Sequence, residues 1–459
     1  MAEKFDAIII GGGQSGPFLA VRLATAGRKV ALIERGSMGG TCVNNGCIPT
    51  KTMVASARAA HVARTAARYG VVTGPVSVDY TAVKARKDEI VAGSVKGLVD
   101  WLDATPGVTT ITGEATFTGP HEVEVNGKRL TASQIFLNTG GRPVVPDWPG
   151  LNDVPYLTNV SLMQLGELPS HLMIVGGSYI GLEFAQMFRR FGSEVTVVEH
   201  GDRLIAREDE DISATVQEIL VGEGVKFHFA ARDFSVTKDR AGIALSFRTA
   251  GATAEIRGSH LLVATGRRPN SDGLGLEAAG VATDTRGYVV VNETLETNVP
   301  GVFAMGDVNG RGAFTHTSYN DFEIVSANLL DGADRRVSDR IPAHNLYIDP
   351  PLGRVGMSEN EVRAKGIKAL KGVLPMSRVG RAREKGETQG FMKVLVEADS
   401  KRILGAALLG IEADEVVQSI LHVMAAKQPY TVITETMHIH PTVSELLPSL
   451  FADLNPVVE

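Results

Sequence analysis

The sequence predicts an α/β fold built on a repeated strand–turn–helix–strand unit, followed by a smaller α+β segment. An apolar strand, a glycine-rich turn, a helix and a second strand follow one another over residues 5–34, and the same order returns over residues 172–199. A unit that recurs once at this length indicates a duplicated domain rather than a solenoid. After residue 340, we expect strands at 393–396 and 404–409 and helices at 414–426 and 442–454.

Composition and charge exclude several classes of protein. The chain has 459 residues and a net charge of −6 without any basic block, so we expect no nucleic-acid partner. Hydrophobic residues make up 44% and charged residues 21%, which is ordinary globular usage and excludes a disordered or collagen-like chain. No apolar run reaches the roughly 18 residues of a membrane-spanning helix, so we expect no membrane segment. The N-terminus carries acids and no signal pattern, which predicts a cytoplasmic protein.

The first glycine-rich turn has the spacing of a dinucleotide-binding fingerprint. Gly11 allows the tight turn, Gly13 lets a pyrophosphate approach the backbone, and Gly16 lets the helix pack closely on the strand. The free N–H groups and the positive dipole end of the helix would face the phosphates. Glu34 ends the second strand, where a carboxylate accepts hydrogen bonds from a ribose diol. The unit therefore predicts a Rossmann-type dinucleotide site.

The second unit repeats this fingerprint. Gly176 matches Gly11 and Gly181 matches Gly16, while Ser178 replaces the middle glycine. Serine is small and still leaves room near a phosphate. Two fingerprints in one chain predict two bound dinucleotides.

The acid that ends the second unit predicts which pyridine nucleotide is used. Glu199 pairs with a free ribose 2′-hydroxyl and repels a 2′-phosphate, which favours NADH. His200 and Arg203 follow it, so NADPH remains an alternative.

The chain has two cysteines, Cys42 and Cys47. A secreted disulfide scaffold needs more cysteines spread along the chain, and two without nearby histidines cannot form a four-ligand zinc site, so no metal site is expected. Residues 50–68 read as a helix, and a helix N-terminus favours a thiolate. The pair is therefore either two structural thiols or a local redox pair.

Five segments resemble the class I pyridine nucleotide–disulfide oxidoreductases, which include dihydrolipoamide dehydrogenase, glutathione reductase and mercuric reductase. The redox motif is the Gly-Gly-Thr-Cys-Val-Asn-Asn-Gly-Cys-Ile-Pro-Thr-Lys stretch at 39–51. The others are the crossings between domains at 139–143 and 264–269, the second FAD motif at 302–307, and the His-Pro-Thr-x-x-Glu signature within 438–445.

This resemblance implies a role for each catalytic residue. Cys47 would lie against the flavin as the charge-transfer thiolate, and Cys42 would be the interchange thiol that meets the substrate. Lys51 would lie near the flavin. His440 would be the acid–base that reaches Cys42 of the other subunit, and Glu445 would orient it, which follows the general logic of a thiol, a base and an orienting group.

The resemblance also implies the cofactors, FAD and NADH, and their contacts. Tyr179 would be the gate of the nicotinamide site, Glu183 would pair with Lys51, and Asp307 would hold the ribityl chain of FAD. The helix that follows residue 317 would point its N-terminus at the flavin. The remaining cofactor contacts are expected at Thr41, Gly140, Gly266, Thr315, His316 and Thr317.

Four segments then form three domains. Residues 1–150 and 271–340 would build the FAD domain, residues 151–270 the NAD domain, and residues 341–459 the dimerisation domain. The implied active unit is a homodimer whose sites are shared across the interface, which is also the commonest assembly on general grounds.

The sequence allows more than one class of substrate. The function we expect is transfer of electrons from NADH through FAD and the Cys42–Cys47 disulfide to a small disulfide or dithiol, as in dihydrolipoamide dehydrogenase. Those enzymes usually read Pro-Ser-Lys where this chain reads Pro-Thr-Lys, a stretch nearer the mercuric-reductase-like branch. The alternative is reduction of Hg(II) or Cu(II), although the chain lacks the C-terminal cysteine pair of mercuric reductases. A flavoprotein that only binds a partner would need neither cysteine nor His440.

Overall fold

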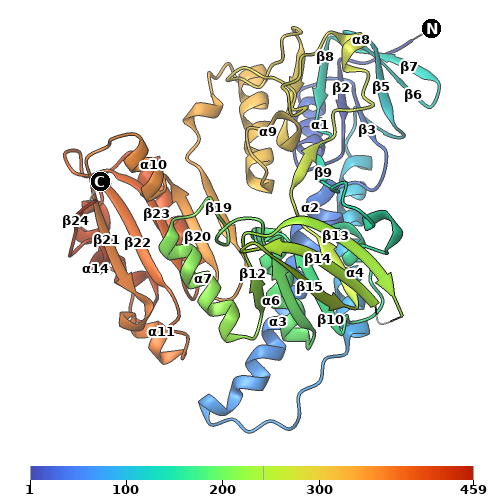
Figure 1. Ribbon diagram of the computed structural model, residues 1–459. Helices are drawn as coiled ribbons and strands as arrows, with labels where there is room; N and C mark the ends of the chain where they lie inside the picture. Colours follow the sequence, from blue (N-terminus) through green and yellow to red (C-terminus); the bar gives the residue numbers. More distant parts are fainter. Residues whose placement is uncertain (1, 241, 458–459) are drawn as a thin grey trace.

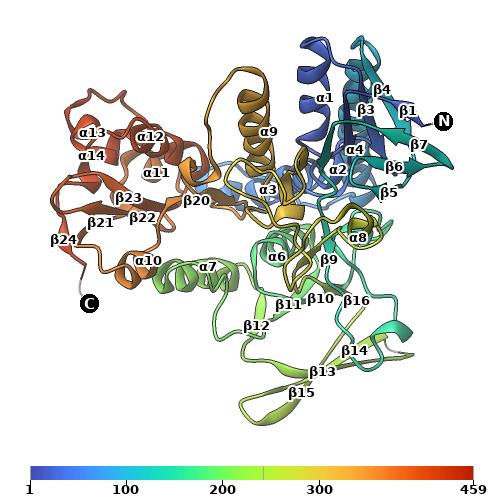
Figure 2. The ribbon, with the colours of Figure 1, turned by 90° about the horizontal axis from the view of Figure 1, so that it is seen from above.

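The computed structural model describes residues 2–240 and 242–457, and it confirms the α/β fold. Figures 1 and 2 show the first glycine-rich unit, the second unit, and a C-terminal sheet that lies to one side of both. Within the described residues, no helix is long and apolar enough to cross a membrane.

The first unit is a five-stranded parallel sheet that combines early and late parts of the chain. Its order is β18 (Val302–Ala304), β8 (Gln134–Leu137), β2 (Ala7–Ile10), β3 (Val30–Glu34) and β4 (Val108–Thr112). The helices α1 (Gly16–Thr25), α4 (Tyr80–Asp103) and α9 (Thr315–Leu330) lie beside it. A second, four-stranded sheet is formed by β1 (Glu3–Lys4), β7 (Lys128–Thr131), β6 (Glu122–Val125) and β5 (Ala115–Gly119).

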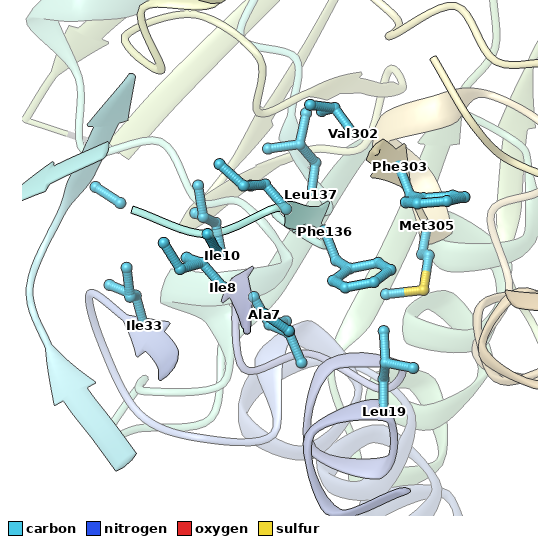
Figure 3. Packing of buried hydrophobic residues seen from close by; sticks show 14 of the residues in the cluster. Ala7, Ile8, Ile10, Leu19, Ile33, Phe136, Leu137, Val302, Phe303 and Met305 are labelled. Atoms are coloured by element: carbon cyan, nitrogen blue, oxygen red, sulfur yellow. The ribbon is translucent and has the colours of Figure 1, made fainter. Parts of the chain in front are cut away.

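The core of the first unit is made by continuous apolar strands, as in parallel sheets that are covered on both faces. Ile8 and Leu137 are fully buried side chains of adjacent strands (Figure 3). Phe136 stacks on Phe303 with ring centroids 5.2 Å apart, which ties β8 to β18. This packing joins the late strand firmly to the N-terminal part of the chain.

The second unit repeats the pattern with the parallel order β12 (Lys226–His228), β11 (Glu194–Val198), β10 (His171–Val175) and β16 (His260–Val263). Its helices are α6 (Tyr179–Phe191) and α7 (Glu210–Gly222). An antiparallel sheet of β13 (Arg232–Asp239), β14 (Gly242–Thr249) and β15 (Ala252–Gly258) extends from it. The two crossings between the units pair as antiparallel strands, β9 (Gly141–Pro143) and β17 (Arg267–Pro269).

The C-terminal part is a six-stranded antiparallel sheet with helices. Its order is β19 (Ala343–Leu346), β20 (Leu352–Gly356), β23 (Ile403–Leu409), β22 (Phe391–Glu397), β21 (Ala369–Pro375) and β24 (Asn455–Pro456). The helices are α10 (Glu359–Ala364), α11 (Gly380–Glu384), α12 (Ala413–Ala425), α13 (Thr431–Glu435) and α14 (Leu447–Leu450).

The expected single helix over 442–454 was wrong. The chain forms a 3₁₀ turn, η6 (Ser444–Leu446), and then the one-turn helix α14. Pro448 has no backbone N–H and cannot continue a helix that arrives from Ser444, so it begins a new turn instead.

The remaining elements are the long helix α3 and short connecting helices and turns. They are α2 (Gly40–Asn45), α3 (Cys47–Thr65), α5 (Asn159–Leu162), α8 (Leu276–Ala279), η1 (Ala66–Tyr69), η2 (Leu151–Asp153), η3 (Gly306–Asn309), η4 (Val337–Asp339) and η5 (Met376–Arg378).

Buried ion pairs join α7 to the C-terminal sheet, beside which it lies in Figures 1 and 2. The Lys393 side chain on β22 is 1% exposed, and its Nζ lies 2.8 Å from an Asp209 oxygen and 2.7 Å from an Asp211 oxygen. These contacts hold the end of the second unit against the C-terminal part.

Candidate active site

The two cysteines lie on successive helices. Cys42 is in the middle of α2, and Cys47 is the first residue of α3, which begins earlier than the expected residue 50. Gly39 makes the turn before α2 with φ at +99°, where a Cβ would lie 2.6 Å from Val43. Both cysteines are free thiols in this structure.

The environment of Cys47 favours its thiolate. Its Sγ lies 3.2 Å from Oγ1 of Thr315. The hydrogen bond from Cys42 is the largest influence, and together with Thr315 and the Lys51 charge it lowers the pKa of Cys47 to about 6, against the opposing effect of burial. The same hydrogen bond between the two cysteines, together with burial, raises the pKa of Cys42. At neutral pH the reduced pair therefore holds its negative charge on Cys47.

A lysine and a glutamate stand next to this thiolate. The Lys51 ammonium lies 2.7 Å from Oε2 of Glu183, which brings α3 and α6 together. The other oxygen of Glu183 accepts the backbone N–H of Tyr347 at 3.0 Å. The Tyr347 ring lies under the ammonium, with Nζ 4.6 Å from its centroid. Lys51 is thus held in place from two directions, and one of its two partners is itself fixed.

The first fingerprint forms a backbone cradle. Gly11 has φ at +108°, and a Cβ there would lie 2.2 Å from the carbonyl oxygen of Asn138. A Cβ on Gly16 would lie 2.3 Å from the carbonyl oxygen of Gly11, and one on Gly40 would lie 2.7 Å from Cα of Gly13. Side chains are therefore excluded where phosphates would meet the backbone.

Glu34 and Glu199, the acids at the ends of the two fingerprint strands, are each held by two backbone N–H groups. Glu34 accepts the backbone N–H of Gly12 at 2.7 Å on one oxygen and that of Gly36 at 2.8 Å on the other. Glu199 accepts the corresponding N–H groups of Gly177 at 2.5 Å and Gly201 at 2.6 Å. Both carboxylates are fixed at the carboxyl end of a strand, where a ribose diol would bind.

A cleft of about 1280 Å³ connects the first fingerprint to the cysteines. The predicted residues that line it are Gly11, Gly13, Glu34, Thr41, Cys42, Cys47, Lys51, Gly140, Tyr179, Glu183, Asp307, Thr315 and His316. Gly16, Gly176, Ser178, Gly181, Glu199, Gly266, Thr317, His440 and Glu445 are not among its lining residues.

The start of α9 closes one side of the cleft. The Thr315 hydroxyl faces Cys47, and His316 Nε2 hydrogen-bonds to the carbonyl oxygen of Ala343 at 2.7 Å. The Thr317 hydroxyl instead caps its own helix by accepting the N–H of Phe314 at 3.1 Å. Asp307 precedes this helix on η3 and lies 3.3 Å from Arg267.

The C-terminal histidine and glutamate form a pair away from the cysteines. His440 Nδ1 lies 2.8 Å from Oε2 of Glu445, and the His440 side chain is 78% exposed. The segment that carries them lies between α13 and α14, which Figure 2 shows on the side of the C-terminal part away from α2.

Several cleft residues were missed by sequence reasoning. They are Asn138, Phe314, His344, Tyr347 and Arg354. Asn138 could have been found, because it is polar and directly follows the apolar strand β8, and ligands bind beyond the carboxyl ends of such strands. The others belong to no local motif and reach the cleft only through tertiary packing.

Comparison with known proteins identifies the family. The family model described as pyridine nucleotide-disulphide oxidoreductase matches residues 5–321, and the dimerisation domain of the same family matches residues 343–450. The chain belongs to the pyridine nucleotide-disulphide oxidoreductases. Members of this family use FAD and a pyridine nucleotide.

Relatives within this oxidoreductase family match over nearly the whole chain. A probable pyridine nucleotide-disulfide oxidoreductase, RclA of Escherichia coli (strain K12), is 36% identical, covering 98% of this chain and 99% of its own. A mercuric reductase of Streptomyces lividans is 35% identical, covering 96% and 94%. A dihydrolipoyl dehydrogenase of Bacillus subtilis (strain 168) is 33% identical, covering 96% of each chain.

Solved structures of this oxidoreductase family agree in fold. The Cu(II) complex of the HOCl-induced flavoprotein disulfide reductase RclA from Escherichia coli superposes with a TM-score of 0.89 at 36% identity, covering 98% of this chain and 99% of that one. The structure of RclA described without Cu(II) gives the same TM-score, covering 97% and 99%.

Proposed function

We propose that this protein is a flavin-dependent disulfide reductase that passes electrons from NADH through FAD and the Cys42–Cys47 pair to a small disulfide. The observation that carries the proposal is the single cleft that holds the first fingerprint, both cysteines and Lys51. A dinucleotide bound along that cleft would reach from Glu34 to the thiols.

The residues present fit FAD. The cradle of Gly11 and Gly13 leaves the backbone open to a pyrophosphate, Glu34 would hold the ribose, and Asp307 would hold the ribityl chain. FAD, when bound, accepts a hydride from the pyridine nucleotide and passes two electrons to an adjacent disulfide. The Lys51–Glu183 ion pair would orient the flavin on the side of the cleft where Cys47 lies.

The cysteines then carry out thiol–disulfide exchange. In the reduced enzyme, Cys42 loses its proton and attacks the substrate disulfide, which releases one substrate thiol and leaves a mixed disulfide. The Cys47 thiolate attacks the sulfur of Cys42, which releases the second half of the substrate as a thiolate that takes its proton from solvent, and the Cys42–Cys47 bond re-forms. The low pKa of Cys47 suits it to this second step, because the thiolate is the attacking species.

His440 supplies the proton transfer that the first step needs. Its Nδ1 is occupied by Glu445, which leaves Nε2 to take the proton from a thiol and to return it to the departing substrate thiol. Because the His440 segment lies apart from α2 within one chain, we propose a homodimer in which His440 of the partner subunit faces Cys42. The match to the family's dimerisation domain supports this assembly.

The test compares His440→Ala with the matched control His438→Ala. The His438 ring hydrogen-bonds to the carbonyl oxygen of Ile433, away from Glu445. We expect turnover with lipoamide and with glutathione disulfide to fall by about 10²–10⁴-fold in His440→Ala. Flavin reduction by NADH, followed by stopped-flow, should be unchanged. A disulfide rate that survives His440→Ala would reject thiol exchange as the function.

A second candidate is reduction of a metal ion, Cu(II) or Hg(II), by the cysteine pair. It is favoured by the similarity to RclA, whose solved structure is described as a Cu(II) complex, and to mercuric reductases. Here the two thiols would be oxidised to the disulfide and release two protons to solvent, and the two electrons would reduce one Hg(II) to Hg(0) or two Cu(II) to Cu(I). No proton transfer by His440 is needed, so metal reduction should be nearly as fast in His440→Ala as in the unmodified enzyme.

A further inference from the structure

Tyr179 is held across the cleft by residues from two other parts of the chain. It is the first residue of α6, and its hydroxyl lies 2.8 Å from Oε1 of Glu208. His344 Nε2 lies 3.1 Å from the same hydroxyl and 2.8 Å from the same carboxylate oxygen. The three groups form a closed triangle of polar contacts beside the cleft.

The protonation states fix the direction of these contacts. Burial alone would raise the pKa of Glu208, but the His344 hydrogen bond and the Arg354 charge outweigh it and lower that pKa. Burial and the Glu208 charge raise the pKa of Tyr179. A carboxylate only accepts hydrogen bonds, so the Tyr179 hydroxyl donates to it, and His344 donates through Nε2.

His344 is itself fixed in place from two directions. Its ring stacks on Phe314 at the start of α9, with centroids 5.4 Å apart and planes 2° from parallel. Its cross-strand partner in the pairing of β19 with β20 is Arg354, whose guanidinium lies 3.2 Å from the other oxygen of Glu208. The β19–β20 pair therefore presents two donors to one buried carboxylate, and the Tyr179 hydroxyl is the third.

We propose that Glu208 and His344 are positioning residues that latch Tyr179 over the nicotinamide pocket. The inference rests on the proposed use of a pyridine nucleotide and on the family resemblance, which implies that Tyr179, a cleft-lining residue, is the gate that the nicotinamide ring must pass. Entry of that ring then breaks the hydrogen bond between Tyr179 and Glu208. The rest of the nucleotide, which would bind along the second fingerprint, does not disturb the latch.

Because only the nicotinamide ring opens the latch, we expect the latch to affect the binding of two ligands differently. NAD⁺ carries the nicotinamide ring and must open the latch, whereas ADP-ribose lacks the ring and need not. The variant His344→Phe keeps an aromatic ring for the stack on Phe314 but cannot donate to Glu208. The variant Tyr179→Phe removes only the hydroxyl, so it deletes the Tyr179–Glu208 hydrogen bond itself and leaves the ion pair between Arg354 and Glu208 intact.

The experiment measures binding of NAD⁺ and of ADP-ribose to the oxidised holoenzyme by calorimetry. We expect Tyr179→Phe, which removes the bond that ring entry must break, to bind NAD⁺ about three- to tenfold more tightly, the equivalent of one hydrogen bond. His344→Phe removes only the group that positions Glu208, so it should shift NAD⁺ binding in the same direction by less. Binding of ADP-ribose should be unchanged in both. The double variant should bind NAD⁺ no more tightly than Tyr179→Phe alone. Equal shifts for both ligands, or NAD⁺ binding that is unchanged or weaker in Tyr179→Phe, would overturn the latch. An unmodified enzyme that binds neither ligand would overturn the proposed function itself, and the latch with it.

Discussion

Cys47 Sγ lies 3.2 Å from Oγ1 of Thr315, although 268 positions separate the two residues in the chain. Thr315 is the first residue of α9, and Cys47 is the first residue of α3. Two helix N-termini thus meet at one thiol, and both favour negative charge there.

Replacing Thr315 by Val should make the Cys47 thiolate harder to form. The hydroxyl supports the low pKa of Cys47, so its loss should raise that pKa by about one pH unit. The measurement is the rate at which iodoacetamide alkylates the Cys47 peptide of the reduced protein, followed by mass spectrometry from pH 4 to 9. The unmodified protein should reach half its maximal rate near pH 6, and the variant only at higher pH. Thr317→Val is the control, because that hydroxyl contacts the Phe314 backbone.

Glu199→Gln should weaken the choice of NADH over NADPH. Glu199 is a buried residue, and its carboxylate is held by two backbone N–H groups, so it cannot swing away from a 2′-phosphate. We expect the unmodified enzyme to prefer NADH by roughly tenfold to a hundredfold in kcat/KM, and the variant to lose most of that ratio. Glu194→Gln, at the exposed start of the strand β11 that precedes Glu199, is the control. An unmodified enzyme that uses NADPH equally well would point to Arg203 or His200 as a phosphate contact.

Lys393→Met should destabilise the join between the second unit and the C-terminal sheet. The ammonium is buried among three acids, and Met leaves Asp209 without its closest cation. Removing one partner of a buried ion pair costs about 3–5 kcal/mol of unfolding free energy. Lys368→Met removes an ion pair that is more than four-fifths exposed and should change stability by less than about 1 kcal/mol. Urea unfolding at one protein and FAD concentration measures the free energy of unfolding of both variants. An equal loss in Lys393→Met and Lys368→Met would contradict a stabilising role for the buried ion pairs.

The local parts of the fold could be predicted from the sequence because their signals are local. Gly11 and Gly176 each require a turn that few residues other than glycine can make, and the strands around them are continuously apolar. The segment around Pro448 was predicted as one helix because its apolar spacing is helical, but the missing N–H of proline divides it.

The arrangement around the cysteines could be predicted only in part. Cys47 and Lys51 lie four residues apart on α3, so their proximity follows from helix geometry, whereas Cys42 belongs to the preceding helix α2. Thr315 was expected at the flavin, but its contact with Cys47 depends on how α9 meets α3. The contact between Tyr179 and His344 carries no sequence signal, because it forms only when β19 packs beside α6.

The central claim is that electrons from NADH reach the Cys42–Cys47 pair, and a count of thiols tests it most directly. The oxidised holoenzyme is mixed with NADH without oxygen, and the free thiols are then titrated in the unfolded protein. We expect two new thiols per chain in the unmodified enzyme, and none in Cys42→Ser or Cys47→Ser, although FAD stays bound in both. Flavin that is reduced by NADH while no new thiols appear in the unmodified enzyme would contradict this claim.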